Sequence, residues 1–281
     1  MISLDGKLVS QKRLHQLKQE IDELKERKPK LVVLRVGNHE ASKIYVKKKI
    51  EACHFVGIES EEIHLDENSS KDLIVNWIEK LNHDAQVDGI LIQLPLPDHI
   101  STNDVLERIS PDKDVDGFHV ENLGKLIIRD ESGFVACTPL GIMTLLSHYQ
   151  VDLKGKFAVV MGRSRIVGRP MSLLLDAAGA TVCIIHSKTE NPKRWTEQAD
   201  ILIVAIGQPE SIDKSFIKKG AIVVDVGIHQ IDGKIVGDVK KENLSEWVSA
   251  LTPVPGGVGP MTICSLLENC LFAFKKRFNL I

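Results

Sequence analysis

Apolar residues in the first half of the chain follow two alternating patterns, one with helical spacing and one of short continuous runs. Between Ser10 and Arg27 they recur at helical spacing, and Pro29 ends this helix before the apolar run 31–34, which predicts a buried strand. The next expected elements are a helix over about 42–56 ending at Gly57, a strand over 62–65, a helix capped by Ser69 and reaching about Leu81, and a strand over 89–94. This alternation favours a parallel sheet covered by helices on both faces.

The pattern breaks between residues 122 and 136, where no period is sustained, and it resumes in the second half. A helix is expected to begin near Thr138, with Pro139 at an early helical position. The later elements are a strand over 157–161, a glycine turn, a helix over 170–178, strands over 181–185, 201–205 and 221–226, and a last helix over 261–277. The sequence therefore predicts an α/β fold of two lobes. The first comprises residues 1–137 and a returning C-terminal helix over 263–281, and the second comprises residues 138–262 and is of nucleotide-binding type.

Composition narrows the possible partners. The chain of 281 residues carries 36 basic and 38 acidic side chains, interspersed, so we expect neither a nucleic-acid face nor a polybasic membrane surface. Its five cysteines are scattered without a C-x-x-C pair, which predicts reduced thiols, no disulfide and no metal site. No signal peptide or membrane-spanning run is recognisable, so a cytoplasmic protein with a small-molecule partner is expected.

The turn after the strand 157–161 has the context of a dinucleotide-binding loop. Gly162, Arg163, Ser164 and Gly168 lie between a strand and a helix, where backbone N–H groups and a helix N-terminus can face a pyrophosphate. The spacing departs from G-x-G-x-x-G, because Ser164 replaces the second glycine and the closing glycine comes one residue late. A tight turn without a ligand would also explain these glycines.

The end of the following strand favours NADP over NAD. An acid usually holds the ribose 2′-hydroxyl of NAD at this point, but the sequence here is His186-Ser187-Lys188-Thr189. A hydroxyl at Ser187, with Arg163 nearby in the glycine loop, suits a 2′-phosphate that a carboxylate would repel. The alternative is that these residues are simply a polar strand end.

Candidate chemistry in the first lobe begins with Tyr45 and Lys49, which are four residues apart and share a helical face. An aromatic ring beside an amine could stack a flat substrate and move a proton, although most lysines on so basic a helix would be solvated. Gln93 and Leu94 follow a buried strand, at the carboxyl edge where α/β sheets bind ligands.

Two loops complete the candidate constellation. The turn 112–117 holds three acids, Asp112, Asp114 and Asp116, any of which could accept from paired N–H groups of a ligand, as a carboxylate holds a guanidinium, or simply be solvated. The segment 252–262 combines prolines with glycines, and Pro255, Gly256 and Gly257 would allow a ligand to approach the backbone of a rigid loop.

Eight segments, in this order, resemble the bifunctional methylenetetrahydrofolate dehydrogenase/methenyltetrahydrofolate cyclohydrolase family, and the resemblance covers about residues 4–271. They are Tyr45-x-x-x-Lys49, QLPLP at 93–97, DKDVDGF at 112–118, CTPxG at 137–141, GRSxIVGRP at 162–170, HSKT at 186–189, DVGI at 225–228 and TPVPGGVGPMT at 252–262. Each motif alone is modest, whereas eight in register are highly specific.

The resemblance implies roles for individual residues. Lys49 would be the key catalytic residue, with Gln93 tuning it, Tyr45 stacking on the folate and Asp116 anchoring the pterin. It further implies that Gly162 to Ser164, Ser187 and Ile228 hold NADP in a Rossmann-type domain. The implied protein is a cytoplasmic homodimer that oxidises 5,10-methylenetetrahydrofolate and hydrolyses the methenyl product to 10-formyltetrahydrofolate, in one-carbon metabolism and purine biosynthesis.

Two other classes remain as alternatives. Shikimate-dehydrogenase-like enzymes share the order of substrate lobe and NADP lobe, but they do not account for QLPLP or PVPGGVGP. A non-catalytic NADP-binding sensor is the other, and the presence of Tyr45, Lys49, Gln93 and Asp116 together argues against it. Short-chain dehydrogenases are excluded, because their Tyr-x-x-x-Lys pair follows the glycine loop, whereas here it precedes it.

Overall fold

The computed structural model describes residues 1–280, apart from the side chain of Ala41. The chain divides into two compact units. The six-stranded unit comprises residues 1–11 and 138–262, and the three-stranded unit comprises residues 12–137 and the C-terminal residues from 263 onward. No helix among the described residues is long and apolar enough to cross a membrane.

The three-stranded unit contains a parallel sheet in the order β3-β2-β4. The strands are β2 (Lys30–Val36), β3 (Glu59–Leu65) and β4 (Gly89–Ile92). Central β2 is buried on both faces from Leu31 onward, which explains its continuous apolar sequence. All three strands end at the same edge, and this carboxyl edge carries Gln93.

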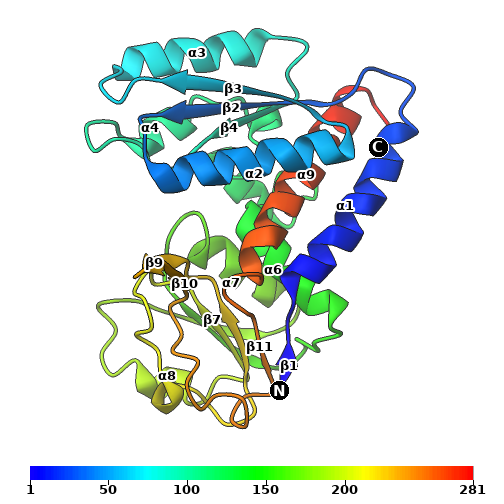
Figure 1. The fold of residues 1–281 in the computed structure, drawn as a ribbon. Helices are drawn as coiled ribbons and strands as arrows, with labels where there is room; N and C mark the ends of the chain where they lie inside the picture. Colours follow the sequence, from blue (N-terminus) through cyan, green and yellow to red (C-terminus); the bar gives the residue numbers. More distant parts are fainter. Residues whose placement is uncertain (281) are drawn as a thin grey trace. The chain divides into compact units, whose positions relative to one another are not determined.

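Helices cover both faces of this sheet. One face packs on α1 (Gly6–Asp22), α2 (Glu40–Val56) and α9 (Val258–Arg277), through a core that includes Ile21, Val33, Val46 and Phe274. On the other side lies α3 (Lys71–His83), as Figure 1 shows. The remaining helices of this unit are α4 (Thr102–Leu106), the short 3₁₀ helix η1 (Pro111–Lys113) and α5 (Val120–Ile128).

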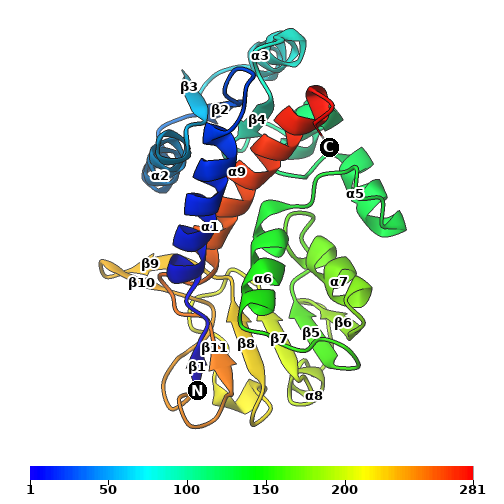
Figure 2. The same cartoon turned by 90° about the vertical axis from the view of Figure 1, so that its right-hand side faces the viewer.

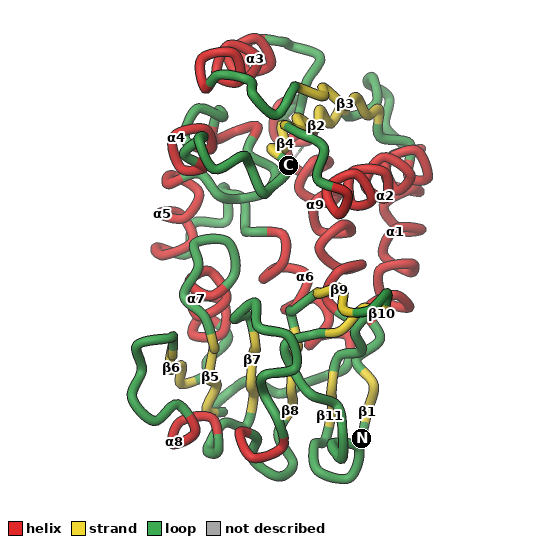
Figure 3. The backbone as a smooth tube through the Cα atoms, turned by 60° about the vertical axis from the view of Figure 1, so that its left-hand side comes forward, coloured by secondary structure: helices red, strands yellow, loops and turns green. Residues whose placement is uncertain are grey.

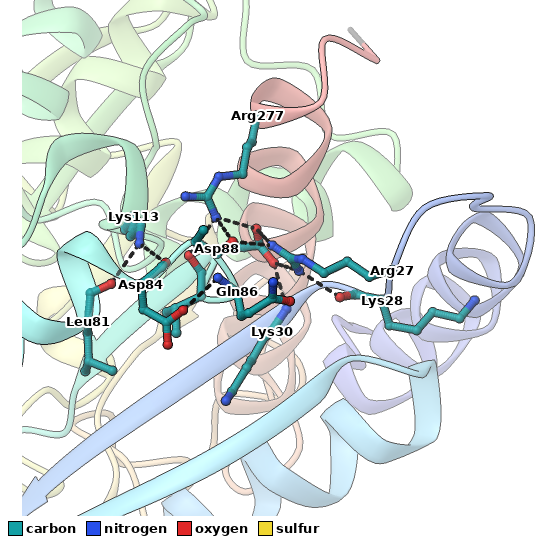
Figure 4. A network of polar contacts seen from close by, with 11 residues as sticks. Arg27, Lys28, Lys30, Leu81, Asp84, Gln86, Asp88, Lys113 and Arg277 are labelled. Carbon is teal, nitrogen blue, oxygen red and sulfur yellow. Dashed lines mark hydrogen bonds and ion pairs between the residues drawn. The ribbon is translucent and has the colours of Figure 1, made fainter.

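An ion network holds the amino edge of the same sheet (Figure 4). The side chain of Asp88 is fully buried, and its two oxygens accept from Arg27 at 2.6 and 2.7 Å. Asp88 also accepts from the backbone N–H of Lys30 at 2.9 Å and from Arg277 near the end of α9 at 3.3 Å. Because a buried carboxylate needs such compensation, the network ties α9 to the start of β2.

The six-stranded unit is a parallel sheet in the order β1-β11-β8-β7-β5-β6, with its strands side by side in Figure 2. The strands are β1 (Ile2–Ser3), β11 (Ala250–Leu251), β8 (Ile222–Asp225), β7 (Ile201–Val204), β5 (Phe157–Met161) and β6 (Thr181–Ile185). From β5 the chain goes first to β6 on one side and then to β7 on the other. This reversal creates the crevice where doubly wound sheets bind dinucleotides.

Two cores enclose this sheet. On one face α6 (Cys137–His148) and α7 (Gly168–Ala177) pack on alternate residues of β5 and β7. The other face is covered by α8 (Lys193–Thr196), the 3₁₀ helix η2 (Lys214–Phe216) and irregular segments that supply Ile212, Leu244 and Val248. A hairpin of β9 (His229–Ile231) and β10 (Lys234–Val236) follows β8, and Figure 3 shows it beyond one end of the strands.

Several helix ends differ from those predicted: α9 begins at Val258 rather than 261 and α7 spans Gly168–Ala177 rather than 170–178, and two further cases show the physical reason. α1 begins at Gly6 rather than Ser10, because Asp5 accepts from the N–H of Leu8 at 2.9 Å and caps it, and it ends at Asp22 rather than Arg27. The cap of α3 is Ser70, not Ser69: its hydroxyl accepts from the N–H of Leu73. Neighbouring serines both suit a cap, so only the backbone path distinguishes them.

Two predictions were wrong: α5 was not expected, and residues 1–11 were assigned to the first lobe rather than to the six-stranded unit. The apolar residues Ile127 and Ile128 of α5 are 64% and 74% exposed while Asn122 is buried, which inverts the usual pattern of a helix. Residues 1–137 were expected in one domain, but β1 pairs with β11, so residues 1–11 group with the six-stranded unit. A two-residue strand has no periodicity to recognise.

Candidate active site and cofactor loops

Lys49 lies on the face of α2 that packs toward the sheet, and only 8% of its surface is exposed. Burial lowers the pKa of its ammonium group, an effect that the negative charge of Asp116 opposes. The neighbouring Lys47 and Lys48 are exposed, so the lysines of this helix are not equivalent. Of the three consecutive lysines 47–49, it is Lys49 that occupies an environment favouring a neutral amine.

Gln93 joins Lys49 to the carboxyl edge of the sheet. It follows β4 directly, and its Oε1 accepts a 3.0 Å hydrogen bond from the Nζ of Lys49 across 44 residues of sequence. Its own Nε2 donates to the carbonyl of Leu94 at 2.7 Å, which orients the amide so that the oxygen faces the lysine. A neutral acceptor fixes the amine without adding a charge that would raise its pKa.

The three acids of the turn 112–117 have different environments. Asp112 is exposed and pairs with Lys276 at 2.7 Å. Asp114 is buried and accepts from the N–H of His119 and from Asn122, and burial raises its pKa to about 7. Asp116 is the acid whose charge acts directly on Lys49, and burial also raises its pKa. The structure thus separates three residues that sequence left equivalent.

Buried asparagines hold this turn in place. Asn122 donates to Asp114 at 2.8 Å and to the carbonyl of Pro111 at 3.1 Å, while its oxygen accepts from the N–H of Phe134. Asn269 on α9 donates to the carbonyls of Val115 and Val135 at 2.8 and 3.0 Å. Sequence analysis missed both residues, since nothing marks an asparagine 154 positions from Val115 as its partner.

Cys137 is buried beside Asp116. Its thiol donates to the carbonyl of Val115 at 3.2 Å, and burial together with the charge of Asp116 holds its pKa well above the usual range. Cys53, one turn beyond Lys49 on α2, has its pKa raised to about 12 by burial. Neither thiol is therefore set up as a thiolate nucleophile.

Tyr45 and Ser42 extend the face of α2 that carries Lys49. Tyr45 lies one turn before Lys49 and is half-buried, which raises the pKa of its phenol. Ser42 lies a further turn back; its buried hydroxyl has no hydrogen-bond partner within the described residues. The spacing 42, 45, 49 marks one helical face, yet sequence analysis named only the last two.

The glycine loop of the six-stranded unit is closely packed on its own backbone. Gly162 has a φ of 118°, and a Cβ there would collide with the carbonyl oxygen of Ala205 at the end of β7. A Cβ on Gly168 would collide with the carbonyl of Gly162. The hydroxyl of Ser164 accepts from the N–H groups of Val167 and Gly168 and so closes the turn that leads into α7. These contacts explain the unusual spacing of the motif.

Ser187 and Arg163 are both exposed at the ends of neighbouring strands. Ser187 follows β6, Arg163 follows β5, and the N–H of Gly162 donates to the carbonyl of Ile185 at 2.8 Å. The turn 186–189 is closed by the N–H of His186, which donates to the hydroxyl of Thr189 at 3.0 Å. The arrangement leaves a hydroxyl and a guanidinium at the outer side of the crevice.

Ile228 follows β8 and is 43% exposed at the same edge. In the loop 252–257, the carbonyl of Gly256 accepts from the N–H of Lys7 at 2.8 Å, and a Cβ on Gly6 would collide with the carbonyl of Gly257. Both glycines thus pack against the start of α1, while Pro255 is exposed. Pro255, Gly256 and Gly257 belong to the six-stranded unit. Lys49, Gln93 and Asp116 belong to the three-stranded unit.

Family comparisons cover both units. Residues 4–116 match the catalytic domain of tetrahydrofolate dehydrogenase/cyclohydrolase, and residues 136–278 match the NAD(P)-binding domain of the same enzymes. The chain belongs to the tetrahydrofolate dehydrogenase/cyclohydrolase family. It is accordingly an enzyme with a dehydrogenase and a cyclohydrolase function and with a domain that binds a nicotinamide dinucleotide, and the resemblance found in its motifs is confirmed.

Individual relatives match over nearly the full length. The bifunctional protein FolD of Aquifex aeolicus is 51% identical over 98% of this chain and 96% of its own. The crystal structure of the bifunctional FolD from Campylobacter jejuni is 50% identical, with a TM-score of 0.96 and 99% of each chain covered. The Trypanosoma brucei enzyme, solved with NADP and an inhibitor, is 34% identical with a TM-score of 0.94, over 99% of this chain and 98% of that one.

The shikimate alternative receives only a likeness of fold. A shikimate dehydrogenase from Aquifex aeolicus is 14% identical with a TM-score of 0.53, covering 88% of this chain and 92% of that one. Such a match reflects the shared doubly wound architecture and says nothing of the substrate. The two-lobed α/β fold with parallel sheets is confirmed, and the shikimate reading has no further support.

Proposed function

We propose that the chain oxidises 5,10-methylenetetrahydrofolate to the methenyl form with NADP⁺ as hydride acceptor, and then hydrolyses the methenyl form to 10-formyltetrahydrofolate. The observation that carries this proposal is the buried hydrogen bond between Lys49 and Gln93 at the carboxyl edge of the three-stranded sheet. It supplies an amine of lowered pKa where α/β sheets bind substrates. The glycine loop and the exposed Ser187 supply the second requirement, a dinucleotide site.

In the hydrolytic step water adds to the carbon of the methenyl cation, the C–N bond to N5 breaks, and one proton is released. A neutral Lys49 amine can accept that proton, because its pKa is lowered by burial. The bond to Gln93 occupies one N–H of the amine and so directs its lone pair away from the amide. Lys49 is the proposed general base, and Gln93 is the residue that orients it.

The pterin is proposed to be anchored by Asp116, whose carboxylate can accept from paired N–H groups of a flat heterocycle. Tyr45 offers a half-buried ring one turn from Lys49, on which such a heterocycle can stack. Leu94 follows Gln93, and Pro255, Gly256 and Gly257 are retained as proposed substrate contacts from the resemblance. Asp114, Asn122 and Asn269 position the turn that carries Asp116.

The dehydrogenase step relies on positioning, and NADP⁺, when bound, supplies the hydride acceptor. The residues present fit this group: the packing of Gly162 and Gly168 leaves no room for a Cβ and lets the backbone turn tightly at the start of α7. Ser187 and Arg163 can hold the 2′-phosphate, which favours NADP over NAD, and Ile228 faces the other half of the cofactor.

Absorbance measurements on the purified protein test both activities. With 5,10-methylenetetrahydrofolate we expect reduction of NADP⁺ in preference to NAD⁺, and acidification should convert the 10-formyl product back to the methenyl chromophore. No turnover with either cofactor would refute the proposal. Turnover in which the methenyl chromophore is already present before acidification and does not increase on acidification would remove the hydrolase half alone.

A homodimer and a cytoplasmic location are proposed from the family resemblance. The five cysteines are all free thiols, four of them buried, which suits a reducing compartment. Light scattering on the purified protein tests the oligomeric state: a mass near 31.2 kDa rather than twice that value would contradict the dimer.

A further inference from the structure

Two buried carboxylates at the carboxyl edge of the six-stranded sheet connect loops that are far apart in sequence. Asp225 ends β8, and its carboxylate accepts from the N–H groups of Gly227, Asp238 and Val239 at 2.9 to 3.1 Å. Asp238, which lies beyond the β9–β10 hairpin, accepts from the N–H groups of Ile206 and Gly207 at 2.8 and 3.0 Å. The two acids thus cross-link the loops that follow β7, β8 and β10.

The glycines beside these acids show how closely the loops are packed. A Cβ on Gly227 would collide with the carboxylate of Asp238, and a Cβ on Gly237 would collide with that of Asp225. Gly227, two residues after Asp225, therefore packs against Asp238. Gly237, the residue before Asp238, packs against Asp225. Thr252 adds a further tie, because its hydroxyl accepts from the N–H of Asp225 at 2.8 Å. The two carboxylates are held by these contacts as long as the loop backbones keep the same conformation.

His229 completes the arrangement and is the partly exposed member of it. Its Nε2 lies 2.7 Å from the remaining oxygen of Asp238, whose side chain is fully buried, while 21% of the histidine side chain is exposed. His229 directly follows Ile228, so the histidine links Asp238 to the residue proposed to face the cofactor. Of the donors to the carboxylate of Asp238, Ile206 and Gly207 follow β7, and His229 begins β9 just after β8.

The order of strands assigns these loops to one half of the dinucleotide. Ser187 after β6 marks the adenosine side of the crevice, and the chain reverses at β5, so the nicotinamide side lies toward β7 and β8. The loop after β7 also touches the glycine loop, since a Cβ on Gly162 would collide with the carbonyl of Ala205.

We propose that His229 and Asp238 form a positioning pair that holds the loops receiving the nicotinamide half of NADP. Hydride transfer then depends on the pair, whereas hydrolysis of the methenyl substrate and binding of the adenosine half do not. This inference rests on the proposed function of the six-stranded unit as an NADP site. It assigns a role to residues outside the glycine loop and outside the strand end that carries Ser187.

The test compares two ligands in two variants of the full-length enzyme. His229→Phe removes the side-chain donor to Asp238 and keeps a ring of similar size, and we expect it to weaken NADP⁺ binding by about tenfold or more. Binding of adenosine 2′,5′-bisphosphate, which lacks the nicotinamide half, should stay within about twofold of the parent. His229→Gln can donate to the same oxygen and should restore most of the NADP⁺ affinity.

Two controls make the outcomes decisive. Gln230→Phe alters the adjacent exposed residue of β9 and should leave both affinities unchanged. Hydrolysis of supplied methenyltetrahydrofolate should proceed at the parental rate in His229→Phe, while its dehydrogenase rate falls. Equal loss of both ligands, or parental NADP⁺ affinity, would overturn the positioning role. A parent enzyme that binds neither ligand would instead refute the cofactor assignment, and this proposal with it.

Discussion

The candidate site around Lys49 and the candidate dinucleotide site use different kinds of groups. In the three-stranded unit, chemistry is carried by the buried Lys49 and Gln93 and by the half-buried Asp116, and the pKa values of Lys49 and Asp116 are set by desolvation and by each other's charge. In the six-stranded unit, the ligand edge consists of backbone amides and glycines with exposed side chains such as Ser187. The first arrangement tunes proton affinity, and the second provides shape and dipoles. Substitutions should therefore affect rates in the first unit and affinities in the second.

The largest expected effect is at Lys49. Lys49→Met keeps the volume of the side chain and removes the proposed base, so hydrolysis of methenyltetrahydrofolate should fall by about 10²- to 10⁴-fold. A stopped assay on supplied methenyl substrate measures this loss, and cofactor binding should be unchanged. Lys48→Met, at the exposed neighbour, is the matched control. A Lys49→Met enzyme that hydrolyses at the parental rate would remove Lys49 from the mechanism.

An acid at Ser187 should change affinity without changing the hydrolytic rate. Ser187→Asp places a carboxylate where the 2′-phosphate is proposed to bind, so the KM for NADP⁺ should rise by roughly 10- to 100-fold. The KM for NAD⁺ should rise far less, since NAD⁺ lacks that phosphate. Initial rates with both cofactors provide the measurement. An equal change for the two would show that Ser187 does not lie at the 2′ position.

A charge at Gln93 should move the pH dependence of hydrolysis. In Gln93→Glu a carboxylate replaces the neutral partner of Lys49 and raises the pKa of the amine, so less neutral amine is present at pH 7. The rising limb of the rate profile should shift to higher pH, and the rate at pH 7 should fall by about tenfold. Gln93→Met removes the acceptor without a charge and should lower the rate with no shift of the limb. An unshifted profile in Gln93→Glu would contradict the orienting role.

The smallest predicted effect concerns stability. Burial raises the pKa of Asp114 from 3.8 to about 7, so between these values the folded state holds more protons than the unfolded state. Its contribution to stability is present below about pH 4 and is lost as the pH rises through about 7. Asp114→Asn should remove up to one proton from this dependence, or about 1.4 kcal/mol per pH unit.

Urea unfolding between pH 4 and pH 8 measures that slope. Asp98→Asn, at an exposed acid, serves as the control and should leave the slope unchanged. An Asp114→Asn protein with the parental slope would show that the carboxyl of Asp114 does not hold its proton in the folded state.

The sequence predicted element boundaries most accurately where the signal lies within a single helix or strand. The strand 157–161, the strand 181–185 and the end of α2 at Gly57 were predicted to the residue, since continuous apolar runs and a glycine in the left-handed region are local signals. The helix α5 was not predicted, because its apolar residues Ile127 and Ile128 face outward and give no helical pattern of buried positions. The short strands β1 and β11 pair across 248 residues, and no local pattern announces such a pair.

The candidate sites show the same difference between local signals and long-range contacts. Residue types and spacing on one element determined the pair Tyr45 and Lys49, the glycine loop and the absence of an acid after β6. Only the tertiary structure decided which lysine is buried, which acid of the turn 112–117 acts on it, and that Asp238 ties the loop after β7 to His229. The reason is physical: propensity and periodicity act over a few residues, whereas burial, charge coupling and hydrogen bonds depend on distances that folding alone sets.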